Sequence, residues 1–125
     1  MVNVLFICLG NICRSPMAEA VFRHLVKQEG LEREISVDSA GMEGWHTGEL
    51  PHKGTRKLLD SNQISYADMK SRKFSNKDFV TFDLIIGMDE ENINDLVRLV
   101  GKSDKVRLLS SFVPQVGWKE VPDPW

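Results

Sequence analysis

The sequence predicts an α/β protein with a doubly wound, four-stranded parallel sheet and helices on both of its faces. Three observations lead to this prediction. Short apolar runs of strand length alternate along the chain with segments of helical periodicity. The apolar runs are nearly continuous, as in strands buried on both faces of a parallel sheet. Two cysteines, an arginine and a serine lie between the first run and the first helical segment, at the place where such folds bind ligands.

Residues 2–7 (VNVLFI) are the first apolar run and predict the first strand. The helical pattern that follows extends from Pro16 to about Gln28, since proline suits a first helical position and Gly30 a helix end. Its apolar residues are expected to share one face: Met17, Ala18, Val21, Phe22, Leu25 and Val26. Its charged residues are expected on the opposite face: Glu19, Arg23 and Lys27.

The rest of the chain continues the alternation. The predicted elements are a strand at 34–41, a short helix at 53–62, a strand at 81–89, a helix directly after it and a strand at 105–109. The last helix carries one apolar face and ends before Gly101: Ile93, Leu96, Val97 and Val100. The basic segment 69–78 is expected to be a solvated face. Strands separated by helices imply βαβ crossovers and therefore a parallel sheet.

Composition indicates one domain, residues 1–125, in the cytoplasm. A net charge of −2 indicates no bulk affinity for nucleic acid or membranes, and no apolar stretch is long enough to span a bilayer. Two cysteines do not make a disulfide framework, which favours a reducing compartment. These cysteines and three scattered histidines lack the ligand spacing of a structural zinc site, so no metal or other cofactor is expected.

The segment from Cys8 to Arg14 carries the clearest chemistry. Cys8 stands just past the first strand, and the next helix offers an anion its unpaired N–H groups and the positive end of its dipole. Gly10 and Asn11 tolerate the backbone angles that turn successive N–H groups inward. Arg14 can bind two phosphate oxygens at once. The sequence therefore predicts a phosphate-binding loop after the first strand, in which Cys8 is a thiolate nucleophile.

This Cys-x5-Arg motif lies within CLGNICRSP and is paired with VPDPW at 121–125; together they resemble the low-molecular-weight protein tyrosine phosphatases. The similarity extends through DSAG, GWHTGELPH and FVTFDLIIGMDEEN, over essentially the whole chain. It implies hydrolysis of phosphotyrosine in protein substrates without a metal. In that family the phosphoryl group moves to the loop cysteine, an aspartic acid protonates the leaving phenol, and water hydrolyses the cysteinyl phosphate.

Carried onto this chain, the resemblance makes Cys8 the nucleophile and places phosphate or another oxyanion against Arg14 and the loop amides. The phosphate-binding loop residues are Leu9, Gly10, Asn11, Ile12, Cys13 and Ser15. Asp123 becomes the general acid, and a phosphate dianion beside the Cys8 thiolate favours its protonated form. An Asp-Pro pair is otherwise a common turn signal.

Three side chains have two candidate roles each. Ser15 is expected to be a helix N-cap and, by resemblance, to stabilise the departing thiolate. Cys13 is either a small hydrophobe packed behind the loop or, by resemblance, a thiol that forms a reversible disulfide with Cys8 under oxidation. Asp89 either caps the helix that follows it or supports the site from behind.

The remaining site predictions concern polar support and aromatic walls. Asn11 and Ser39 resemble the family pair that locks the loop by a side-chain hydrogen bond, although Ser39 alone would be an ordinary turn residue. Trp45 and Trp125 are the expected walls for an aromatic ring. The three histidines have no fixed partner in the sequence, and none is offered as catalytic: His24, His46 and His52.

Two alternatives remain on the same fold. Protein arginine phosphatases resemble this family but typically carry a threonine where this loop has Ile12, and a bulkier apolar residue favours an aryl ester. A phosphate-binding module with weak or no turnover is the other alternative.

The family's relatives continue past the Asp-Pro-aromatic motif into a C-terminal helix, whereas this sequence stops at Trp125. If the chain ends there, exposed apolar surface is expected to promote self-association or to lower the stability of the fold. Asp123 would then lie two residues from a free carboxylate, and weak catalysis is expected.

Overall fold

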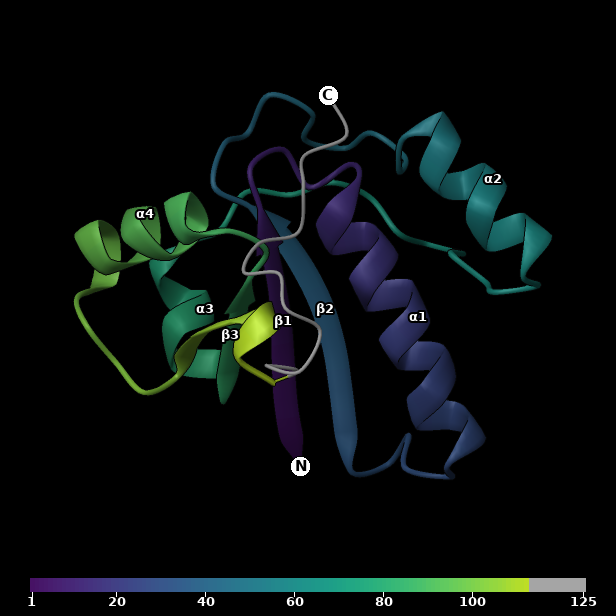
Figure 1. The fold of residues 1–125 in the computed structure, drawn as a ribbon, viewed down its shortest axis with the longest axis horizontal. Coiled ribbons are helices and arrows are strands. Elements are labelled where there is room, and N and C mark those ends of the chain that lie inside the picture. The colour runs from purple at the N-terminus through teal and green to yellow at the C-terminus, as the bar shows by residue number, and fades with distance from the viewer. Residues whose placement is uncertain (113–125) are drawn as a thin grey trace.

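The computed structural model describes residues 1–112, which fold into a parallel sheet with helices on both sides (Figure 1). In chain order the elements are β1 (Val2–Cys8), α1 (Arg14–Gln28), β2 (Ile35–Gly41), α2 (Lys53–Ser61), α3 (Asn76–Thr81), β3 (Leu84–Gly87), α4 (Glu90–Val100), β4 (Val106–Leu108) and the 3-10 turn η1 (Leu109–Phe112). The four strands are ordered β2-β1-β3-β4 and every pair is parallel. The predicted fold class is confirmed.

Alternation of side chains along the central strand β1 sets the two layers of the core. Val4 and Phe6 pack with the α1 residues Ala18 and Phe22, and the rings of Phe6 and Phe22 meet edge to face, 5.7 Å apart. Leu5 and its neighbour Ile7 face the other side, where α3 and α4 supply their partners. Since Cys8 continues the even-numbered series, it packs on the α1 side at the carboxyl end of the sheet.

The predicted faces of α1 need correction. The helix begins at Arg14, two residues before the predicted start. Glu19, expected on the exposed face, is only 4% exposed, whereas Leu25, expected on the buried face, is 50% exposed. Because α1 packs against both β2 and α2, its buried surface is wider than a single apolar stripe and includes Glu19.

Only part of the segment 69–78 is the solvated face that its basic character suggested, namely its exposed lysines Lys70, Lys73 and Lys77. Met69, Ser71 and Phe74 are buried, and the Arg72 guanidinium donates to Asp38 at 3.1 Å and 3.3 Å and to Asp78 at 3.0 Å and 3.1 Å. Burial alone would lower the pKa of Arg72, but its hydrogen bonds and ion pairs with Asp78 and Asp38 outweigh burial and raise the pKa.

The helix α3 was not predicted, and its residues were partly assigned to the strand at 81–89. The strand β3 is consequently shorter, Leu84–Gly87. A capping box between Ser75 and Asp78 begins α3, and this Ser-x-x-Asp spacing is a recognisable helix-start signal in the sequence.

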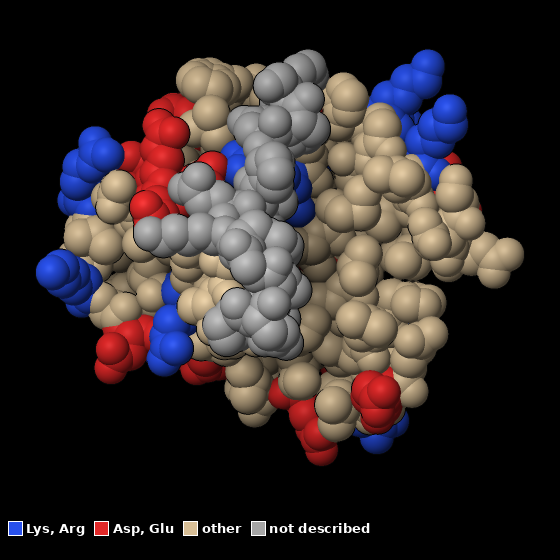
Figure 2. Space-filling model, viewed as in Figure 1, with Lys and Arg blue, Asp and Glu red and all other residues tan. Residues whose placement is uncertain are grey.

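Charge is distributed without a dominant sign on the face that Figure 2 presents, where acidic and basic side chains are interspersed around the edge. Within residues 1–112, no helix combines the length and the apolar character that crossing a membrane requires.

Candidate active site

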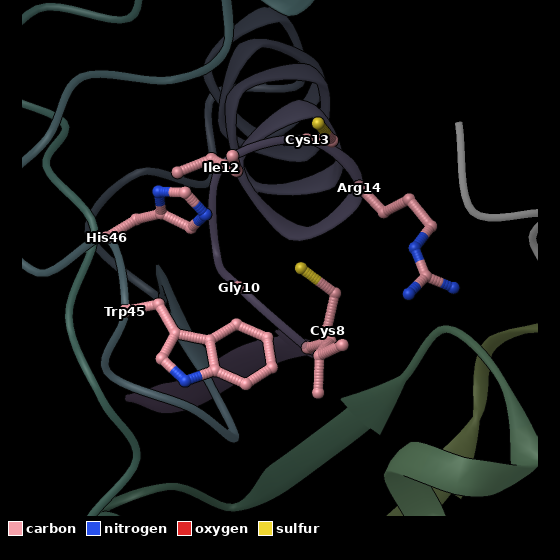
Figure 3. A pocket seen from close by; sticks show the side chains of 8 residues that line it. Cys8, Gly10, Ile12, Cys13, Arg14, Trp45 and His46 are labelled. Carbon is pink, nitrogen blue, oxygen red and sulfur yellow. The ribbon is translucent and has the colours of Figure 1, made fainter. Parts of the chain in front are cut away.

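The loop that joins β1 to α1, residues 8–14, forms one wall of a cavity of about 400 Å³ (Figure 3). We call residues 8–14 the phosphate loop. Cys8 is the last residue of β1 rather than the first beyond it, and Arg14 is the first residue of α1. The cavity is lined by Cys8, Leu9, Gly10, Ile12, Cys13, Arg14, Trp45 and His46.

The carbonyl groups of the phosphate loop are bonded to donors outside the loop. Four of them accept such bonds: Cys8 from the Met42 N–H (3.0 Å), Leu9 from the Glu43 N–H (2.9 Å), Gly10 from the Ser71 hydroxyl (3.0 Å) and Ile12 from the His52 N–H (2.6 Å). Because a trans peptide is planar, the N–H of each following residue points the opposite way. Four backbone N–H groups are thus turned toward the inside of the loop, which is the arrangement of an anion-binding nest.

The Cys8 sulfur lies inside this loop and is 3% exposed as a residue. The Asn11 N–H donates to Cys8 Sγ at 3.3 Å, and Ser15 Oγ lies 3.0 Å from the same sulfur. Ser15 Oγ also accepts a hydrogen bond from Asn11 Nδ2 at 2.8 Å. The single hydroxyl hydrogen of Ser15 is therefore available to donate to the sulfur.

Ser15 is not the helix N-cap that the sequence suggested. The N-cap position is Cys13, which makes no side-chain capping bond, and Ser15 lies in the first turn of α1. Its hydroxyl points to the loop instead of the helix backbone, because Asn11 and Cys8 both bond to it.

Asn11 is the central polar residue of the loop, 1% exposed with a φ of 56°. The predicted hydrogen bond to Ser39 is present, with Nδ2 donating at 2.9 Å, and Oδ1 accepts from the Arg72 N–H at 3.0 Å. Together with the bond to Ser15, these contacts occupy every polar atom of the amide. Asn tolerates the left-handed region better than most residues, so the side chain and the backbone act together.

Gly10 was predicted to adopt an unusual backbone conformation, and this prediction is wrong. Its φ is not among the positive values, so Asn11 alone supplies the left-handed turn within the loop. A Cβ at Gly10 would lie 3.2 Å from Cδ2 of His46. Gly10 thus provides space for the imidazole ring rather than conformational freedom.

A buried carboxylate stands behind Asn11. The Ser39 hydroxyl donates to Glu19 Oε1 at 2.6 Å, and Arg23 forms an ion pair with Glu19 Oε2. Burial raises the pKa of Glu19, although the hydrogen bond from Ser39 and the charge of Arg23 oppose that shift. Glu19 is therefore tied to the phosphate loop through Ser39.

This shift predicts a pH-dependent stability. A carboxyl group whose pKa is raised in the folded state stabilises the fold below its unfolded value of about 4.5 and loses that contribution as the pH rises through the folded pKa. The free energy of unfolding of Glu19→Gln, relative to the natural chain, should therefore increase as the pH rises above 4.5. Urea titrations across that range measure this difference. The exposed control Glu32→Gln should give a flat difference, and a flat difference for Glu19→Gln would refute the assignment.

The contacts of Asp89 fit both of its candidate roles. It is the N-cap of α4, where Oδ1 accepts from the Asn92 N–H at 2.8 Å. Its other oxygen, Oδ2, accepts from Arg14 Nη1 at 2.7 Å, and both side chains are largely buried. Asp89, which follows β3, thus holds the Arg14 guanidinium at the cavity.

Of the remaining predicted site residues, some line the cavity or lie near it, and others lie outside the residues that the structure describes. Trp45 lines the cavity and is 68% exposed, as an aromatic wall requires. Cys13 is buried and, like Cys8, is not part of a disulfide; Figure 3 shows its side chain pointing away from the Cys8 sulfur. Asp123 and Trp125 lie outside the described residues.

Sequence reasoning missed several residues that shape the site. Ser71 and Arg72 bond to the outer side of the phosphate loop, and His46 lines the cavity. Gly41 allows close approach, since a Cβ there would lie 2.8 Å from the Leu9 carbonyl oxygen. Only His46 had a local signal, a glutamate three residues later in GWHTGE. Among residues 1–112, no group of three histidine, cysteine or acidic side chains could hold a metal ion.

Comparison with known proteins agrees with this geometry. The low molecular weight protein-tyrosine-phosphatase YfkJ of Bacillus subtilis is 47% identical to this chain, over 100% of this chain and 81% of that protein. The corresponding enzyme of Schizosaccharomyces pombe is 42% identical over 99% of this chain and 81% of its own. The crystal structure of YfkJ matches with a TM-score of 0.97 at 48% identity, over 99% of this chain and 79% of that one.

A further solved structure, described as the Drosophila arginine phosphatase DARP, has a TM-score of 0.89 at 35% identity, over 98% of this chain and 80% of that chain. The profile of the family described as low molecular weight phosphotyrosine protein phosphatase matches residues 3–125. The chain belongs to the low molecular weight phosphotyrosine protein phosphatase family.

Proposed function

We propose that this protein hydrolyses phosphotyrosine in protein substrates through a phosphate ester of Cys8, as a single domain acting in the cytoplasm without a metal. The observation that carries the proposal is the phosphate loop itself. Four of its carbonyls are bonded outside the loop, so that four N–H groups turn toward its inside, and one of them, the Asn11 N–H, donates to Cys8 Sγ. Arg14 stands at the edge of the same cavity.

In the first step the Cys8 thiolate attacks phosphorus and an S–P bond forms. The bond between phosphorus and the tyrosine oxygen breaks, and the phenolic oxygen leaves with the electron pair and takes a proton from Asp123. The inward N–H groups and the Arg14 guanidinium bind the three equatorial oxygens, where negative charge accumulates. These donors are in place before the substrate arrives, so little reorganisation is needed.

In the second step water attacks phosphorus, Asp123 accepts the proton of that water, and the S–P bond breaks. Inorganic phosphate leaves and the thiolate is regenerated. The Ser15 hydroxyl, 3.0 Å from the sulfur, donates to the thiolate as it forms. Asn11 keeps the hydroxyl in that orientation by donating to its oxygen.

The walls of the cavity favour an aryl ester over a phosphoguanidinium group. Trp45 presents an exposed indole, and Ile12 is a buried apolar residue of the loop that also lines the cavity. An aromatic ring packs well on such surfaces, whereas a phosphoarginine needs polar partners for its nitrogens. Phosphotyrosine is therefore the substrate that the cavity supports best.

The substrate assignment is tested with two otherwise identical peptides, one carrying phosphotyrosine and the other phosphoarginine. We expect kcat/KM to favour phosphotyrosine by roughly tenfold or more, a difference of the size that one lost apolar or polar contact produces. Ile12→Thr should reduce the ratio of kcat/KM for the phosphotyrosine peptide to that for the phosphoarginine peptide. A preference for the phosphoarginine peptide would identify the protein as a protein arginine phosphatase. Binding of phosphate with no turnover of either peptide would indicate a phosphate-binding module.

Cys13 is proposed to protect Cys8 during oxidation. Neither cysteine is in a disulfide in the structure, and a disulfide between them requires the Cys13 side chain to turn toward Cys8. Mild peroxide should inactivate the natural chain reversibly, with dithiothreitol restoring activity. In Cys13→Ser the same dose should inactivate irreversibly, because the Cys8 sulfenic acid oxidises further to sulfinic acid. Equal recovery of activity in both proteins would show that Cys13 only packs behind the loop.

A further inference from the structure

One cavity residue has no part in the chemistry proposed above. His46 follows Trp45 in the connection between β2 and α2 and lines the same cavity as Cys8. Figure 3 shows its imidazole extending over the phosphate loop beside Ile12 and Gly10, with one ring nitrogen directed toward the cavity. A polar ring in this position is available to a substrate that enters the cavity.

The position of the imidazole is fixed from three sides. Nδ1 is 2.8 Å from Oε2 of Glu49, which holds one edge of the ring. The missing side chain of Gly10 provides the space for the ring, since a Cβ there would lie 3.2 Å from Cδ2. The backbone is held as well, because the Glu49 N–H donates to the His46 carbonyl at 2.9 Å and the Glu49 carbonyl accepts from Ser71 at 2.8 Å.

The contact with Glu49 also decides which nitrogen faces the substrate. A carboxylate only accepts hydrogen bonds, so Nδ1 carries a hydrogen. Nε2 is then the atom left for a ligand, and within residues 1–112 it has no hydrogen-bond partner. In an imidazolium ring, Nε2 is a charged donor.

The cavity has few groups that can carry positive charge. Of its eight lining residues, only Arg14 and His46 can be cationic. Arg14 bonds to Asp89 at 2.7 Å and is assigned to the transferred phosphate. A second negative group on the same substrate would be repelled by that phosphate, and among the lining residues His46 is the other one that can be cationic and so offset the repulsion.

We propose that His46 is a specificity-determining residue whose imidazolium Nε2 binds the carboxylate of an aspartate or glutamate next to the phosphotyrosine. The proposal rests on the proposed function and narrows its substrate class to acidic phosphopeptides. Trp45 and His46 are consecutive and line one wall. A tyrosine ring against Trp45 therefore brings the residues that flank it to His46.

The test compares two phosphotyrosine peptides that differ only in a glutamate or a glutamine beside the phosphotyrosine. The ratio of their kcat/KM values is measured at about pH 5.5 and about pH 8, on either side of the range in which histidine side chains change charge. The natural chain should favour the glutamate peptide about threefold at the lower pH, as expected for a partly exposed ion pair, and lose this preference at the higher pH.

Three variants assign the effect to His46. His46→Gln should show no preference at either pH, whereas His46→Lys, a permanent cation, should favour the glutamate peptide at both. His24→Gln removes a histidine of α1 that lies outside the cavity and should behave like the natural chain. If His46→Gln does not fold, His46→Asn provides the same neutral replacement and should likewise show no preference at either pH.

Other titratable groups do not confuse the result. Glu49, Cys8 and Arg14 face the ring or the cavity, but all three remain in His46→Gln, so a preference that depended on them would persist in that variant. Equal rates for the two peptides in the natural chain, or a preference that survives in His46→Gln, would overturn the role of His46 and leave the proposed function intact. Failure to hydrolyse either peptide would instead contradict the proposed function.

Discussion

Cys8→Ser is expected to reduce turnover of para-nitrophenyl phosphate to the uncatalysed background while phosphate still binds. A serine hydroxyl is a weak nucleophile near neutral pH without an adjacent base, and the hydroxyl of Ser15 cannot remove its proton. Phosphate binding does not depend on the sulfur, because the N–H groups of the phosphate loop are oriented by hydrogen bonds between the loop carbonyls and residues outside the loop. Losses of a nucleophile in other hydrolases reach roughly a millionfold in kcat.

Steady-state kinetics measures the turnover, and calorimetric titration with inorganic phosphate measures the binding. Cys13→Ser is the matched control, since it removes the other cysteine of the chain and should retain multiple turnover. Residual catalysis by Cys8→Ser above background would remove Cys8 from its role. Loss of phosphate binding together with loss of activity would show that the sulfur is also needed for the phosphate loop to bind phosphate.

Arg14→Lys is expected to lower kcat by roughly a hundredfold to a thousandfold, the range seen when one preorganised donor to a developing charge is removed. Lysine keeps the positive charge but replaces the planar fork with a single ammonium group, which cannot bind two phosphate oxygens in parallel. The guanidinium is also oriented by Asp89, with 2.7 Å between Nη1 and Oδ2. A shorter and more flexible side chain loses that orientation as well.

Two further variants test whether the geometry of the Arg14 guanidinium matters. Arg33→Lys makes the same substitution at an exposed position away from the cavity, and its kinetic constants should equal those of the natural chain. Asp89→Asn keeps an N-cap for α4 but weakens the hold on Arg14, so its effect on kcat should be smaller than that of Arg14→Lys. A rate for Arg14→Lys close to that of the natural chain would argue against bidentate binding of phosphate.

The strands were predictable because a parallel sheet buries both faces of each strand, which leaves continuous apolar runs in the sequence. The helix α1 was harder, since its contacts with β2 and α2 bury Glu19 and leave Leu25 exposed, against the single apolar stripe that periodicity assumes. The helix α3 occupies only six residues and was hidden in a basic segment. Its capping box was the available signal.

The candidate site was predictable where one short segment carries the chemistry. Cys8 and Arg14 follow from the spacing of a loop between a strand and a helix, and the contact between Asn11 and Ser39 followed from the resemblance. The supports of the loop were not predictable, because Ser71 and Arg72 reach it from about sixty residues away in sequence, with separations of 61. The need for glycine at position 10 was not predictable either, because it depends on the neighbouring ring of His46, which leaves little room for a side chain.

Trapping the covalent intermediate tests the central claim most directly. The natural chain is mixed with para-nitrophenyl phosphate, quenched within milliseconds, digested and mapped by mass spectrometry under conditions that preserve thiophosphate esters. We predict a phosphoryl group on the sulfur of Cys8, formed and consumed at rates that match turnover, and none on Cys13 or His46. A phosphoryl group on another residue, or rapid turnover with no phosphorylated peptide at any time, would contradict this account.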